Sequence, residues 1–255
     1  MLEKFSLAGK VAIVTGSSTG LGQGMALGLA QAGADIVGVD YVSEQADTKA
    51  KIEALGRKFY TIQKDLIHAS VKELDGIIQE TVQVFGKLDI LVNNAGIIRR
   101  EDSVDFSEKN WDDVMNINIR AVFFLSQAAG RQFIKQGNGG KIISIASMLS
   151  YQGGIRVPSY TASKSAVKGI TMTLANEWAK YNINVNAIAP GYMATNNTAA
   201  LRDDEVRAGQ ILERIPAGRW GTPEDVAGAC VFLASEASNY VNGFTLAVDG
   251  GWLGR

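Results

Sequence analysis

Short apolar runs rich in Val and Ile recur along this chain and alternate with longer segments of helical period. The runs are VAIVT, ADIVGVD, FYTIQKD, DILVNNA, KIISIAS, INVNAI and FTLAVD. Runs that are apolar on both faces predict strands of a parallel sheet, and the longer segments predict crossover helices. The pattern therefore predicts an α/β fold with a doubly wound, seven-stranded parallel sheet and helices on both faces.

The alternation continues through the chain without a linker, repeat or low-complexity tract. A length of 255 residues, of which 46% are hydrophobic, suits one α/β domain, so we predict a single domain over 1–255. Residues 191–222 interrupt the alternation with a polar, partly helical insertion. At the ligand-binding edge of a sheet, such an insertion is either a substrate lid or a plain surface excursion.

A glycine-rich turn, TGSSTGLGQG, follows the first predicted strand and contains Gly16, Gly20 and Gly22. Glycines at a strand-to-helix turn let the backbone approach a pyrophosphate, which the helix start attracts by its free N–H groups. The second strand ends at Asp40, where a carboxylate would accept hydrogen bonds from the adenosine ribose and repel a 2′-phosphate. The order predicts a Rossmann-like dinucleotide site that prefers NAD to NADP, although a strand-end turn is the alternative for Asp40.

Other polar residues at strand ends and on one helix are candidates for the same site. Asp65 closes the third predicted strand, and the NNAG turn of Asn93–Gly96 closes the fourth, with turn capping as the alternative for both. In the segment YTASK, Tyr160 and Lys164 share a helix face at a spacing of four residues. A nearby cation lowers the pKa of a tyrosine, which would make Tyr160 a usable acid. For this pair taken alone, a chance pairing on a solvated helix is the alternative.

Charge and composition narrow the class of function. Lys plus Arg total 25 and Asp plus Glu total 26, so the net charge is −1, and nucleic acid and anionic membranes are poor general partners. The sequence contains no apolar span of membrane length and no leader pattern, which predicts a cytoplasmic protein. A single cysteine, Cys230, and a single histidine, His68, make neither an internal disulfide nor a zinc set, so we expect no metal.

Together these motifs resemble the short-chain dehydrogenase/reductase family over nearly the whole chain. The matching segments are TGSSTGLG, NNAG, an asparagine in WDDVMNINI, a serine in KIISIAS, YTASK, the PG of Pro190 and Gly191, and DGG near the end. Each segment alone is weak, but their shared order is specific. The resemblance implies a nicotinamide-dependent oxidoreductase that interconverts an alcohol and a ketone, assembled as a homotetramer.

The resemblance also implies residue roles. Tyr160 would be the general acid in ketone reduction, Lys164 would lower its pKa and hold the nicotinamide ribose, and Ser147 would bind the substrate oxygen. Asn118, which only the family register selects over Asn116, would hold a proton-relaying water. The cofactor-binding set would comprise Tyr160, Lys164, Gly16, Ser18, Thr19, Gly20, Leu21, Gly22, Asp40, Asp65, Leu66, Asn93, Ala95, Gly96, Pro190, Gly191, Tyr192 and Thr195.

The substrate class depends on loops outside the shared motifs. Arginine suits carboxylates and amides suit hydroxyls, so Arg100, Gln152 and Arg156 predict a small polyhydroxy keto acid as substrate. Pairing with nearby acids is the alternative for such arginines. Several loops also resemble family members that act in bacterial pectin and uronate breakdown. Rival functions are reduction of 5-ketogluconate or a 3-oxoacyl thioester, and, outside enzymes, an NAD-binding sensor or scaffold.

Overall fold

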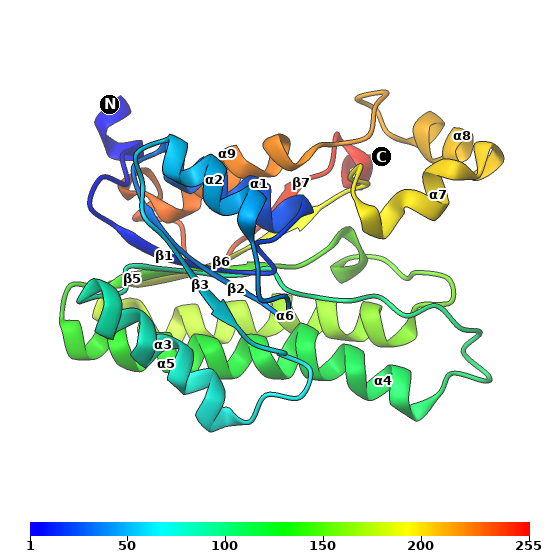
Figure 1. Cartoon of the computed structure of the whole chain (residues 1–255). Helices are drawn as coiled ribbons and strands as arrows, with labels where there is room; N and C mark the ends of the chain where they lie inside the picture. Colours follow the sequence, from blue (N-terminus) through cyan, green and yellow to red (C-terminus); the bar gives the residue numbers. More distant parts are fainter.

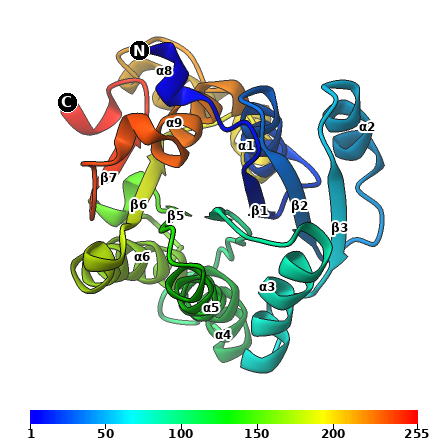
Figure 2. The ribbon, with the colours of Figure 1, turned by 90° about the vertical axis from the view of Figure 1, so that its left-hand side faces the viewer.

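Seven parallel strands form one sheet in the order β3-β2-β1-β4-β5-β6-β7 (Figures 1 and 2). The computed structural model describes residues 1–255, apart from the side chain of Asn197. The strands are β1 (Val11–Thr15), β2 (Asp35–Asp40), β3 (Phe59–Gln63), β4 (Ile90–Asn93), β5 (Gly140–Ile145), β6 (Ile183–Pro190) and β7 (Thr245–Val248). The predicted seven-stranded parallel sheet is confirmed.

Helices cover both faces of this sheet, as the doubly wound prediction requires (Figure 1). One face carries α1 (Gly20–Gln31), α2 (Ala46–Ala54) and α9 (Pro223–Ala234). The opposite face carries α3 (Val71–Phe85), α4 (Glu108–Met115), α5 (Ala121–Gln136) and α6 (Pro158–Trp178). Two short helices, α7 (Ala199–Asp203) and α8 (Glu205–Arg214), lie in the insertion.

Alternation along β1 explains why two apolar layers form. All five of its residues are buried, and neighbouring side chains point to opposite faces of the sheet. Ile13 joins the core beneath α3 and α5, whereas Val14 joins the core beneath α1 and α9. Cys230 of α9 is buried in the second core, as a small core residue should be. Burial on both faces fixes the strand register and thereby the place where each strand ends.

The third strand is shorter than predicted. It ends at Gln63, so Asp65 lies beyond the ladder instead of closing it. The carboxylate of Asp65 accepts a hydrogen bond from the backbone N–H of Ile67, which turns the chain away from the sheet.

The insertion of 191–222 packs at the carboxyl edge of the sheet. An isolated bridge between Met193 and Gly221 closes its base. Ile211 and Ile215 then pack with Met148, from the loop after β5, and with Trp252, near the chain end. The insertion is therefore joined to two other segments that reach the same edge of the sheet.

Candidate active site

A cleft of about 900 Å³ opens at the carboxyl ends of the strands, where the chain order reverses between β1 and β4. Residues from the glycine turn, the NNAG turn, the loop after β5, α6 and the insertion all line it. The structure brings most of the predicted site residues together there, namely Gly16, Thr19, Gly20, Leu21, Gly22, Asp40, Asp65, Leu66, Ala95, Gly96, Arg100, Ser147, Gln152, Tyr160, Lys164, Gly191, Tyr192 and Thr195.

The glycines of the first turn make a cradle that side chains would fill. Gly16 and Gly20 have φ angles of 68° and 58°, which L side chains rarely adopt. A Cβ atom on Gly22 would collide with the carbonyl oxygen of Gly16 and the side-chain amide of Asn94. The first turn of α1 therefore lies directly against the strand end, where helix N–H groups suit a phosphate. The cradle fits a dinucleotide.

Asp40 places a fixed carboxylate at the end of β2. It is 8% exposed, and its Oδ2 atom accepts hydrogen bonds from the backbone N–H and the hydroxyl of Ser18, at 3.1 and 2.7 Å. Its Oδ1 atom accepts a hydrogen bond from the backbone N–H of Tyr41 at 2.8 Å. Ser18 thus acts on the cleft through Asp40, since Ser18 itself is outside the described lining.

The NNAG turn has its two asparagines in different roles. Asn93, a predicted cofactor residue, is 2% exposed and donates to the hydroxyls of Ser126 and Ser144, so its side chain points into the protein. Asn94, which the sequence prediction passed over, lines the cleft and donates to the carbonyl oxygens of Thr15 and Gly16 at 2.8 and 3.2 Å. It ties β4 to β1 at the point where the glycine cradle begins.

The predicted catalytic pair lies on the first turns of α6. The Nζ atom of Lys164 donates to the carbonyl oxygen of Ile145 at 2.6 Å and lies 5.6 Å from the centre of the Tyr160 ring. Burial lowers the pKa of Lys164 to about 8, because a charged ammonium is poorly solvated there. Both side chains line the cleft, so the proposed acid and its neighbouring cation share one wall.

The pKa of Tyr160 departs from the sequence-based expectation. Burial raises this pKa, while a hydrogen bond from Ser147 and the charge of Arg100 act to lower it. We expected Lys164 to be the cation that lowers it. The buried phenol is instead harder to ionise than an ordinary tyrosine, because desolvation outweighs the opposing contacts.

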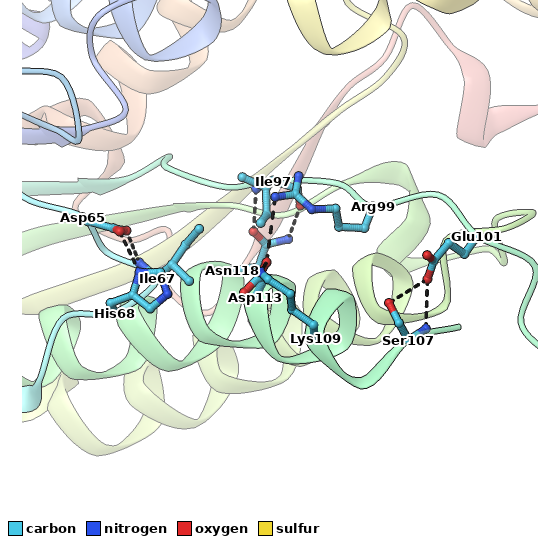
Figure 3. Close-up of polar contacts among 10 residues, drawn as sticks. All are labelled: Asp65, Ile67, His68, Ile97, Arg99, Glu101, Ser107, Lys109, Asp113 and Asn118. Atoms are coloured by element: carbon cyan, nitrogen blue, oxygen red, sulfur yellow. Dashed lines mark hydrogen bonds and ion pairs between the residues drawn. The ribbon is translucent and has the colours of Figure 1, made fainter. Parts of the chain in front are cut away.

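Asn118 is buried and is not part of the described lining of the cleft. Figure 3 shows its contact with Ile97. It belongs to a π-helical turn, Asn116–Arg120, that joins α4 to α5. Its Oδ1 atom accepts from the backbone N–H of Ile97 at 2.9 Å, and its Nδ2 atom donates to the carbonyl of Ile97 and to the hydroxyl of Ser163. Ser163 in turn donates to the carbonyl oxygen of Tyr160 at 2.8 Å. The amide therefore links the NNAG loop to the helix turn that carries Tyr160.

Two arginines, of which Arg156 is a predicted substrate residue, lie within ion-pair distance of aspartates. Arg156 lies outside the described lining and pairs with Asp102 at 2.9 Å, so the structure does not bring it together with the other predicted substrate residues. Arg99 lies 4.0 Å from a carboxylate oxygen of Asp113, which also pairs with Lys109 (Figure 3). Pro190, a predicted cofactor residue, is likewise buried at the end of β6 and outside the lining.

Sequence reasoning missed the wall that α8 contributes. Arg207, Gln210, Ile211 and Arg214 line the cleft at spacings of three and four residues, which place them on one helix face. The spacing of these residues in the sequence could have predicted that they share one helix face. Trp252 also lines the cleft, but no local pattern marks a lone aromatic residue near the chain end.

The part of the cleft beyond β3 carries Asp65, which contacts the single histidine, His68. Asp65 lines the cleft, and its carboxylate lies 2.7 Å from Nδ1 of His68, which lowers the pKa of Asp65 (Figure 3).

Among the residues that the structure describes, no three His, Cys, Asp or Glu side chains gather as a metal site. None of the described helices is long and apolar enough to span a membrane.

Comparison with known proteins identifies the family. A family model described as enoyl-(acyl carrier protein) reductase matches residues 16–253. The chain belongs to the short-chain dehydrogenase/reductase family. Short-chain dehydrogenases/reductases use a nicotinamide cofactor, which agrees with the glycine cradle and with Asp40 at the end of β2.

Close relatives of this short-chain dehydrogenase/reductase are full-length matches. It is 67% identical over 255 residues to the 2-dehydro-3-deoxy-D-gluconate 5-dehydrogenase of Dickeya dadantii, covering 100% of both chains. A solved structure from Agrobacterium tumefaciens, described as a 2-deoxy-D-gluconate 3-dehydrogenase with bound NADP, is 53% identical, covers 99% of each chain and has a TM-score of 0.92. A gluconate 5-dehydrogenase from Burkholderia cenocepacia in complex with NADP and tartrate is 39% identical, covers 100% of this chain and 99% of its own, and has a TM-score of 0.94.

Proposed function

We propose that this protein is an NAD(H)-dependent oxidoreductase that interconverts 3-deoxy-D-glycero-2,5-hexodiulosonate and 2-dehydro-3-deoxy-D-gluconate. The observation that carries the reaction type is the placing of Tyr160, Ser147 and Lys164 in one cleft with the glycine cradle. The substrate rests on the full-length identity of 67% to a relative that is named for this reaction. Such a reaction belongs to the bacterial breakdown of pectin and uronates.

The residues of the cleft supply the proton chemistry of ketone reduction. When bound, the nicotinamide supplies hydride to the carbonyl carbon at position 5 of the diketo acid. The hydroxyl of Tyr160 donates its proton to the carbonyl oxygen as negative charge develops there, and the hydroxyl of Ser147 donates a hydrogen bond to the same oxygen. In the reverse direction Tyr160 takes the proton back.

A charged environment stabilises the phenolate that proton transfer leaves on Tyr160. The charge of Arg100 acts to lower its pKa and so favours the phenolate. The ammonium of Lys164 lies 5.6 Å from the ring centre and acts in the same direction while it remains protonated. In the resting protein the hydroxyl of Ser147 also donates to Tyr160, and this O–H turns to the substrate oxygen when the ketone is bound. In the resting protein the contacts of Tyr160 with Ser147 and Arg100 oppose its burial, and burial prevails and raises its pKa.

We propose NAD as the preferred cofactor. The carboxylate of Asp40 is held in the cleft by Ser18 and Tyr41, where it would accept bonds from ribose hydroxyls and repel a 2′-phosphate. The nearby ammonium of Lys64 pairs with Glu73 at 3.1 Å, so an acid already partly neutralises its charge. Since the two solved relatives contain NADP, the test has to compare both cofactors.

We further propose that residues 191–222 act as a substrate lid within the single domain. Thr195, at its start, lies beside the phosphate cradle, since a Cβ on Gly20 would lie 3.7 Å from its Cγ2 atom. The helices of the insertion line the cleft on their Arg207 and Arg214 face. A homotetramer is our proposal for the assembly, and light scattering of the purified protein checks it.

The test is NADH consumption by the purified protein with the 2,5-diketo acid, beside NADPH and 5-ketogluconate. We expect turnover of the diketo acid with NADH and a loss of about 10²- to 10⁴-fold in kcat in the Tyr160→Phe variant. Turnover of 5-ketogluconate alone would keep the mechanism and reject the substrate. If the protein binds the cofactor but consumes no NADH with either substrate, an NAD-binding sensor would be favoured.

A further inference from the structure

Three side chains from distant parts of the chain meet at the lid side of the cleft. The guanidinium of Arg214, at the end of α8, lies 4.0 Å above the ring of Trp252, near the chain end. The Oε1 atom of Gln152, in the loop before α6, accepts from Nε1 of Trp252 at 3.3 Å and from Nη2 of Arg214 at 3.4 Å. All three residues line the cleft.

The partners that hold Arg214 are neutral. Within the described part of the chain, no Asp or Glu forms an ion pair with this guanidinium. Arg99, Arg156 and Arg219 differ, because each lies within ion-pair distance of an aspartate. Arg214 is thus oriented by a ring and an amide while its positive charge stays uncompensated, which suits a ligand carboxylate.

Trp252 is itself rigidly placed. It is 5% exposed and packs edge-on against Tyr192, with ring centres 4.8 Å apart. Tyr192 also packs against Trp220. A guanidinium that rests on such a ring loses less conformational freedom when it binds an anion than a free arginine does.

Two further arginines, Arg100 and Arg207, also line the cleft. The charge of Arg100 acts to lower the pKa of Tyr160, so this arginine influences the phenol that would meet the reacting carbonyl. The carboxyl carbon of a 2,5-diketo acid is four bonds from that carbonyl, about 5 Å at single-bond lengths of ~1.5 Å. The carboxylate can therefore be bound by a residue of the lining other than those that meet the reacting carbonyl.

We propose that Arg214 binds the substrate carboxylate, with Trp252 and Gln152 as positioning residues that hold its guanidinium over the cleft. This inference rests on the proposed sugar-acid function and adds the residue that selects for an acid.

Steady-state kinetics of Arg214→Gln test the proposal with two substrates, the diketo acid and its uncharged methyl ester. We expect kcat/KM for the acid to fall about 10- to 100-fold, mainly through KM, because a charge-assisted hydrogen bond is lost. For the ester, variant and wild type should agree within about twofold, the usual size of effects away from a contact. Arg219→Gln removes one positive charge from the same insertion outside the cleft lining and should leave both substrates unaffected.

Two variants of Trp252 distinguish a loss of orientation of the Arg214 guanidinium from a loss of folding. Trp252→Phe keeps a ring beneath the guanidinium but removes the N–H that binds Gln152. It should raise KM for the acid severalfold with little change in kcat, whereas Trp252→Ala should raise it further. An unchanged KM for the acid in Trp252→Phe and Arg214→Gln alike would refute the proposal.

A binding measurement keeps this test independent of turnover. With NAD present, gluconate should raise the thermal midpoint of the wild type and not that of Arg214→Gln. If the wild type does not reduce the diketo acid but shows this difference, the proposed substrate is wrong and Arg214 still binds a sugar acid. If the wild type turns over the acid and Arg214→Gln matches it in KM, the carboxylate site lies elsewhere.

Discussion

The buried ammonium of Lys164 lowers the stability of the fold, and replacing it by Met makes that cost measurable. The pKa of Lys164 falls from its ordinary 10.5 to about 8 because the charged form is desolvated. That difference corresponds to about 3 kcal/mol of free energy against the charged, folded state. Lys164→Met removes this cost, but it also leaves the carbonyl of Ile145 without its 2.6 Å bond, a loss of about 1–3 kcal/mol. The two effects nearly balance, so we expect equal or slightly higher stability for the variant at pH 7.

The pH dependence separates the two effects. A lysine whose folded pKa is lowered destabilises the protein below about pH 8, and the stability returns as pH rises toward the unfolded value of 10.5. Between pH 7 and pH 10 the wild type should therefore gain about 2 kcal/mol of unfolding free energy relative to Lys164→Met. Lys141, whose pKa burial also lowers to about 8, contributes equally to both proteins and cancels in the difference.

The assay is urea unfolding followed by circular dichroism at pH 7, 8, 9 and 10, without cofactor and at one protein concentration. Lys135→Met changes an exposed lysine and should stay parallel to the wild type at every pH. Loss of ketone reduction should accompany the unchanged or improved stability of Lys164→Met. Parallel pH curves for the wild type and Lys164→Met would show that burial of this charge has no energetic consequence, and the reasoning would fail.

Two further substitutions probe the cofactor end of the cleft. Gly22→Ala should weaken NADH binding at least about tenfold in a fluorescence titration, because the added methyl collides with Gly16 and Asn94, and Gly76→Ala, which meets nothing within 4 Å, is its control. Normal binding by Gly22→Ala would contradict the cradle. Asp40→Ser should raise the ratio of NADPH to NADH efficiency at least about tenfold, since like charges no longer repel, and an unchanged ratio would remove Asp40 from cofactor selection.

The sequence predicted correctly those features that depend only on residues close together in the chain. The apolar run VAIVT became β1 residue for residue, and the glycines after it form the predicted cradle, because strand burial and left-handed turns depend on nearby residues. The pair Tyr160 and Lys164 shares a helix face for the same reason. The sequence could not show which of the two adjacent asparagines turns its side chain inward, because the serines of β5 and α5 that bind Asn93 lie far along the chain.

Long-range contacts account for the remaining differences. Gln152, Arg214 and Trp252 are separated by up to 100 residues, so no sequence window contains their cluster. The pKa of Tyr160 was misjudged because the pair was read without the burial that surrounds it. Arg156 was placed in the substrate site by proximity to Tyr160, but the loop directs it to Asp102 instead.

The π-helical turn of residues 116–120 changes the rotation of α4 about the helix axis relative to α5. Each residue of an α-helix advances about 100° around the axis, so a turn with one extra residue rotates everything before it relative to everything after it. Val114 and Ala121, on either side, are both buried, and Asn118 points inward between them. Deleting one residue from the turn would restore a regular helix and rotate α4 by that angle, exposing Val114 or turning Asn118 away from Ile97. The irregular turn thus lets one continuous helix satisfy the apolar core and hold the NNAG loop, two requirements that a uniform helical repeat cannot meet together.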